Sequence, residues 1–133
     1  MTMLLTADVV PLYAQIVAFD EHDPDGLPEA ESGDEQVVAG FSGLTVATRS
    51  DWVASEATVF PVRVEVWEGS GPTDAGDLHV AWRGEITVGS GGLTVGSLVG
   101  ADLHRVATRP GRRAIVVLTA PAVEPDRVVV VLD

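Results

Sequence analysis

The sequence predicts an all-β protein, a two-layer antiparallel β-sandwich of about eight or nine short strands with at most one short helix. Three observations predict this class. Short runs rich in Val, Leu and Ile recur along the chain, Gly, Pro, Asp and Ser separate them, and two runs alternate apolar with polar residues. Strands of this kind pack as two sheets. With 133 residues, we expect one domain over residues 1–133.

The first expected strand covers residues 12–19, which are apolar enough to lie in the middle of a sheet. Two later pieces resemble one another. Residues 42–47 read Ser-Gly-Leu-Thr-Val-Ala, and residues 91–96 read Gly-Gly-Leu-Thr-Val-Gly. Each is interpreted as a short strand entered through glycine, and two copies are too few for a repeat protein.

Strict alternation marks two further strands, over residues 60–66 and 77–88. In the second strand, His79 and Glu85 are expected on the outward face. The residues expected to face the core are Leu78, Val80, Trp82, Ile86 and Val88. Residues 68–76 are predicted to join the two strands as a long hairpin loop.

The last strands are expected over residues 114–118 and 128–132, whose continuous apolar runs are typical of strands covered on both faces. A turn is predicted at residues 109–112, which read Arg-Pro-Gly-Arg. The one helix candidate runs from a Ser50 cap to Glu56.

Composition excludes several classes of function. The chain has no cysteine, so disulfides and thiolate metal sites are excluded. Its formal net charge is -12, which disfavours nucleic acid and anionic membranes as partners and favours a basic protein or a cation. No apolar run approaches the roughly 20 residues that span a bilayer, and the start does not read as a secretory signal. All eight basic residues are arginine, which suggests a GC-rich bacterial source, and we expect a cytoplasmic protein.

Most of the negative charge lies in one segment, predicted to be a solvated loop over residues 20–35. This stretch holds no arginine, and Pro24, Gly26, Pro28 and Gly33 interrupt regular structure. The candidate partner-binding residues are its carboxylates: Asp20, Glu21, Asp23, Asp25, Glu29, Glu31, Asp34 and Glu35. They form the acidic segment, which is either a solubilising loop or a surface for a basic partner. The five arginines Arg105, Arg109, Arg112, Arg113 and Arg127 are alternative partners for it, within one molecule or between copies.

The sequence also contains candidate ligands for a metal. Residues 21–26 resemble the start of a calcium loop, with Asp23 and Asp25 as ligands, but Ser32 stands where a bidentate glutamate is needed. His79 could join Asp77 and Glu85 around a metal. No Ser-His-Asp set is singled out. Residues 89–92 are glycine-rich without a lysine and predict a turn, not a phosphate loop. Trp67, on the outward side of its strand, is the one tryptophan that is a candidate for ligand stacking, and the role favoured for it is an apolar cover beneath a loop. No cofactor is expected, and calcium is the one candidate ion.

In its order of elements, the chain resembles the competence-J family of small nuclease inhibitors. The resemblance covers residues 12–120: an aromatic first strand (Tyr13 to Phe19), a polar connection, the piece at 41–46, strands at 59–67 and 103–106, the Pro110-Gly111 turn and a strongly apolar strand. It implies a β-sandwich that binds and blocks a nuclease, or a related immunity protein. No functional residue transfers, because no motif carries one.

The leading hypothesis is a non-enzymatic binding protein whose acidic segment engages a basic protein such as a nuclease or toxin. The alternatives are a calcium- or small-ligand-binding sandwich module and a structural subunit of a homo-oligomer.

Overall fold

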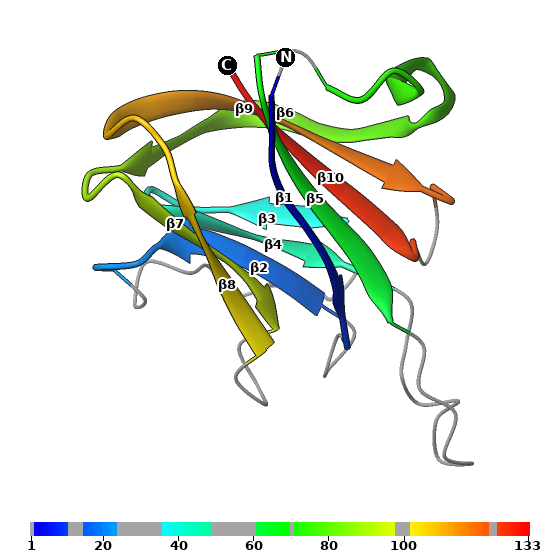
Figure 1. Ribbon diagram of the computed structural model, residues 1–133, viewed down its shortest axis with the longest axis horizontal. Helices are drawn as coiled ribbons and strands as arrows, with labels where there is room; N and C mark the ends of the chain where they lie inside the picture. Colours follow the sequence, from blue (N-terminus) through cyan, green and yellow to red (C-terminus); the bar gives the residue numbers. More distant parts are fainter. Residues whose placement is uncertain are drawn as a thin grey trace.

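Two five-stranded sheets pack face to face in the computed structural model (Figure 1). The structure describes residues 2–10, 15–23, 36–48, 61–69, 71–97, 102–122 and 125–133. The all-β prediction is confirmed: these residues form ten strands and one short 3-10 helix, η4 (Ala75–Asp77). The predicted helix at residues 50–56 lies outside the described residues.

The first sheet has the order β1-β5-β10-β9-β6. Its strands are β1 (Thr2–Val9), β5 (Val62–Glu68), β10 (Arg127–Leu132), β9 (Gly111–Ala120) and β6 (His79–Val88). Neighbouring strands are antiparallel except β10 and β5, which run parallel. The sequence did not indicate β1, which pairs with β5 at the edge of this sheet.

The second sheet has the order β3-β4-β2-β7-β8 and is antiparallel throughout. Its strands are β3 (Val37–Ala39), β4 (Gly43–Ala47), β2 (Gln15–Asp20), β7 (Gly92–Ser97) and β8 (Asp102–Ala107). The predicted central strand is confirmed as β2. The two similar pieces of sequence are β4 and β7, which pair with β2 on opposite sides.

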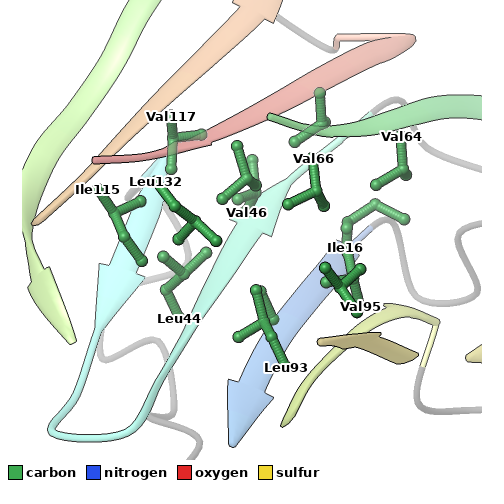
Figure 2. Packing of buried hydrophobic residues seen from close by; sticks show 14 of the residues in the cluster. Ile16, Leu44, Val46, Val64, Val66, Leu93, Val95, Ile115, Val117 and Leu132 are labelled. Carbon is green, nitrogen blue, oxygen red and sulfur yellow. The ribbon is translucent and has the colours of Figure 1, made fainter. Parts of the chain in front are cut away.

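The hydrophobic core lies between the sheets and comes from alternate residues of both (Figure 2). Val64 and Val66 of β5 face Ile16 of β2 and Val46 of β4 across this layer. Each of these four side chains is at most 1% exposed. Burial of a branched side chain stabilises the fold by about 1.5–3 kcal/mol, so the alternating strands hold the two sheets together.

The prediction that β5 and β6 form a hairpin is wrong, because β10 and β9 lie between them. Their connection crosses the outer face of the first sheet, and it appears at the upper right of Figure 1. A Cβ placed on Gly71 would lie 3.2 Å from the Val131 side chain and 3.9 Å from that of Leu118. Close packing of this kind shows that the connection is a cover over β10 and β9.

Arg127 fastens this cover to the sheet. From β10, its Nε donates to Glu65 Oε2 at 2.6 Å, and its Nη1 donates to Asp74 Oδ2 at 2.6 Å. Glu65 also accepts the indole N–H of Trp67 at 3.0 Å. Burial would raise the pKa of Glu65, but the bonds from Arg127 and Trp67 outweigh it and hold that pKa below its ordinary value.

A bulge in β6 changes which side chains face the core. The register against β9 shifts between Val80, which lies opposite Leu118, and Trp82, which lies opposite Val117. The extra residue reverses the alternation before it. Val80, predicted to be a core residue, is therefore 40% exposed, whereas Ile86 is 1% exposed as predicted.

Among the described residues, no helix has the length and apolar character needed to cross a membrane.

Candidate partner-binding surface

Four chain turns meet at one end of the sandwich, on the left in Figure 1. We name it the four-turn end and define it by residues 20–23 at the end of β2, 40–42 between β3 and β4, 89–91 between β6 and β7, and 108–110 between β8 and β9. Main-chain hydrogen bonds link them. Asp20 N–H donates to Ser42 O at 2.9 Å, and Thr108 N–H donates to Gly91 O at 2.9 Å. The Ser90 hydroxyl, which donates to Asp20, joins the two pairs of turns, so the four turns form one connected surface.

Asp20 is the last residue of β2, lies on the face of that strand that points to the core, and is 7% exposed. The Ser90 hydroxyl donates to Asp20 Oδ1, and the His22 N–H donates to the same oxygen at 3.2 Å. Burial would raise the pKa of Asp20, but these bonds, with further main-chain donors, outweigh it and lower that pKa. The carboxylate thus ties β2 to the β6–β7 turn and is not a free binding group.

Glu21 lies on the outer side of the second sheet and pairs with Arg105 of β8. Arg105 Nε donates to Glu21 Oε2 at 2.5 Å, and Nη2 donates to Oε1 at 3.1 Å. The hydrogen bonds from Arg105 lower the pKa of Glu21. The carboxylate reaches Arg105 across Gly92 of β7, where a Cβ would collide with it. Glycine at residue 92 therefore leaves room for this two-bond ion pair.

Asp23 accepts a hydrogen bond from the Ser42 hydroxyl at 2.6 Å, and its N–H donates to Asp20 O at 2.9 Å. The predicted calcium ligand Asp23 is thus bonded to the β3–β4 turn, and Asp25 lies outside the described residues. Within the part of the chain that the structure describes, no three His, Cys, Asp or Glu side chains gather as a metal site.

The β6 bulge separates the residues of the other candidate metal site. His79 lies opposite Thr119 of β9, whereas Glu85 lies opposite Ala114. Thr119 and Ala114 are five residues apart on β9, so their side chains point to opposite faces of the sheet. The prediction that His79 and Glu85 share one outward face is wrong, and the same bulge is the reason.

Three of the eight predicted partner-binding residues are therefore placed, and all three bond within their own chain. The remaining five lie outside the described residues: Asp25, Glu29, Glu31, Asp34 and Glu35. Asp23 lies at the four-turn end. Gln36 lies at the opposite end of the second sheet, where its O accepts the Ala47 N–H. In the sequence, these five carboxylates lie between Asp23 and Gln36.

The arginines of the last third have divided roles. Arg105 pairs with the acidic segment through Glu21, as one of the alternatives anticipated. Arg112 instead pairs with Glu85, and Arg127 binds the cover of the first sheet. Arg113 is 3% exposed; its Nη1 donates to the Thr108 hydroxyl, and its Nη2 donates to Asp133 O and, at 3.4 Å, to Glu68. These bonds connect β9 to the end of β5, to the residue after β10 and to the turn between β8 and β9.

Phe41 is the feature of this surface that the sequence interpretation missed. At 76% exposure it is the most exposed large apolar residue in the described part of the chain. Its carbonyl accepts the Thr87 N–H at 2.8 Å, and the flanking Gly40 N–H donates to Gly43 O at 2.8 Å. The available signal was an aromatic residue inside a Gly-Phe-Ser-Gly turn, which has no core face to enter.

The polar groups at the four-turn end do not form a Ser-His-Asp set. Ser90 donates directly to Asp20, so no imidazole stands between them. The His22 ring lies 3.7 Å from Glu21 and contributes only its main-chain N–H to Asp20. A serine activated as a nucleophile needs a base that accepts its proton and a third group that orients the base. This arrangement instead stabilises a turn.

Comparison with known proteins gives a similar fold and no close relative. No family model matches the sequence, and no curated protein does so either. The solved structure of ComJ from Bacillus subtilis, described as an inhibitor of the DNA-degrading activity of NucA, aligns with a TM-score of 0.64. That alignment covers 98% of this chain and 96% of ComJ at 11% identity. A second structure, crocagin biosynthetic gene J, aligns with a TM-score of 0.51, 14% identity and coverage of 99% and 97%. The resemblance to the competence-J fold is confirmed.

Proposed function

We propose that this protein is a non-enzymatic inhibitor that binds a basic protein, either a nuclease or a toxin that is also basic. The observation that carries the proposal is the end-to-end likeness of the fold to ComJ, at 98% of this chain and 96% of that one. The fold alone does not define function, so the proposal needs support from the surface.

Charge supplies that support. The formal net charge is -12, and nine of the acidic residues lie within residues 1–35, which contain no arginine or lysine. A DNA or RNA ligand would be repelled by this field, whereas a protein that itself binds nucleic acid presents the opposite charge. Clustered charge of this kind raises association rates about 10-fold or more at low salt.

The internal bonds of Asp20, Glu21 and Asp23 reduce the set of carboxylates available to a partner. Each of the three already accepts a hydrogen bond from its own chain. We therefore assign the electrostatic attraction to the five acids from Asp25 to Glu35 and give the first three a supporting role. In this proposal, Asp20, Glu21 and Asp23 stabilise the first residues of the acidic segment through their bonds within the chain.

The proposal is tested by nuclease inhibition. Plasmid DNA is incubated with a clarified extract of the source cells, and the purified protein is titrated into the reaction. We expect DNA degradation to fall as the protein is added, and half-inhibition to require more protein at higher salt. An extract whose nuclease activity is unchanged at every ratio and salt concentration would contradict the proposal.

A charge-matched pair of variants tests the role of the acidic segment. The first variant changes the five acids at 25, 29, 31, 34 and 35 to their amides. The control changes five acids elsewhere to amides: Asp8, Asp77, Glu85, Asp102 and Asp126. Each variant loses five negative charges. Only the first should flatten the salt dependence of inhibition, and equal slopes in the two variants would reject the assigned role.

A further inference from the structure

We propose that Phe41 is the aromatic anchor of the inhibitor interface, inserted into an apolar depression with a cationic rim on the partner. This inference rests on the proposed function and names the contact that gives it affinity. The acidic segment accounts for long-range attraction, which governs how fast two proteins meet. A long-lived complex also needs a few desolvated side chains near the centre of the contact, and aromatic residues are the usual ones.

The exposure of Phe41 is the first observation. Folded proteins bury most of a phenylalanine side chain because its transfer from water is favourable, yet Phe41 as a residue is 76% exposed. Met3 and Val80, the other large apolar residues in the described part of the chain that are exposed, reach only 48% and 40%. Those two lie on edge strands of the first sheet, whereas Phe41 stands on a turn of the second.

The rigidity of the turn is the second observation. Four hydrogen bonds fix the main chain around the ring, and they come from three separate segments. Gly40 N–H bonds to Gly43 O within the turn, Thr87 N–H of β6 bonds to Phe41 O, and Asp20 N–H at the end of β2 bonds to Ser42 O. The Ser42 hydroxyl adds the fourth, to Asp23 at 2.6 Å. An anchor already fixed in its bound conformation loses less entropy on binding, so affinity rises.

Negative charge is the third observation, and it favours a basic partner. Ser42, next to the exposed ring, is bonded to Asp23, and the five remaining acids follow Asp23 in the sequence. The exposed ring is thus held beside Asp23, the residue after which the described part of this segment ends. A surface that meets both must be apolar where the ring enters and rich in Lys or Arg around it. A basic protein with an exposed cleft has that chemistry.

The experiment compares Phe41→Ala with Met3→Ala in the plasmid-degradation titration. Both substitutions remove an exposed apolar side chain, but only one lies at the four-turn end. Phe41→Ala should raise the concentration for half-inhibition at least 10-fold, and Met3→Ala should leave it within twofold. Phe41→Tyr, which keeps the ring, should retain most of the inhibition. Melting temperatures of the variants should match the wild type, because the altered side chains are exposed.

The salt dependence of inhibition distinguishes the role of Phe41 from that of the acidic segment. Phe41→Ala should shift the inhibition curve equally at every salt concentration, whereas the five-acid variant should change the slope with salt. If the wild type inhibits and Phe41→Ala inhibits equally well, the anchor is rejected while the inhibitor function stands. If the wild type does not inhibit, both proposals fail. If Phe41 instead holds two copies together, the wild type will sediment as a dimer and Phe41→Ala as a monomer, which also rejects the anchor.

Discussion

Arg127 of β10 and Glu65 of β5 form a hydrogen-bonded ion pair, 2.6 Å from Nε to Oε2, across two strands that run parallel. The Glu65 side chain is 7% exposed and that of Arg127 is 23% exposed, so water screens the pair only in part. Arg127 also holds Asp74, which lies in the connection that covers this face. One guanidinium therefore joins two strands and the cover over them.

Replacing Arg127 with methionine should lower the free energy of unfolding by about 2–4 kcal/mol. The loss of one partner leaves the buried Glu65 carboxylate without its cation, which costs far more than breaking an exposed pair. Arg63→Met is the control, because Arg63 and Asp8 are exposed and 4.0 Å apart. The control should cost no more than about 1 kcal/mol. Equal losses in a urea denaturation would contradict the assigned role of Arg127.

Acid should destabilise the protein partly through Glu65. Its pKa in the folded state lies below the ordinary value of 4.5, so the unfolded chain binds the proton first as the pH falls. The contribution of Glu65 to stability is therefore complete above about pH 4.5 and is lost as the pH falls through the lowered pKa. Glu65→Gln removes this contribution. The free energy of unfolding of this variant should fall less steeply between pH 5 and pH 3 than that of the wild type. Parallel curves would argue against a contribution of Glu65 to the acid sensitivity.

Ser90→Ala should weaken the four-turn end. It removes the hydroxyl that donates to the buried Asp20 carboxylate, and an unsatisfied buried acceptor costs about 1–3 kcal/mol. The pKa of Asp20 should rise, because burial then acts against fewer donors. Ser42→Ala is the comparison: its partner Asp23 is less buried, so we expect a smaller loss. A carboxyl titration by NMR and a urea denaturation measure both effects, and an unchanged Asp20 pKa would refute the assignment.

The bulge in β6 predicts unequal costs at two positions that the alternation of the sequence placed on one face. Val80→Ser should change stability by no more than about 0.5 kcal/mol, because Val80 is exposed. Ile86→Ala should cost about 2–5 kcal/mol, because it leaves a cavity in the core. If thermal unfolding gave similar losses for both, Val80 would have to face the core.

The sequence predicted the class of fold because strand periodicity is a local property. Val62, Val64 and Val66 alternate with polar neighbours, and that pattern alone indicates a half-buried strand. It could not predict which strands pair. The neighbours of β5 are β1 and β10, far apart in the chain, and the expected hairpin with β6 does not form. Pairing between distant strands depends on the whole packed layer, which no short window contains.

For the candidate site, too, some properties follow from the sequence and others only from the tertiary structure. By itself, the sequence determined that this protein is acidic, free of cysteine and mostly β, because charge, composition and alternation are properties of the chain alone. Only the tertiary structure decided that Asp20, Glu21 and Asp23 bond to Ser90, Arg105 and Ser42, and that Phe41 faces solvent. Glu21 and Arg105 are 84 residues apart in sequence. They meet because β2 and β8 lie on either side of β7, a relation that exists only after the sheet has formed.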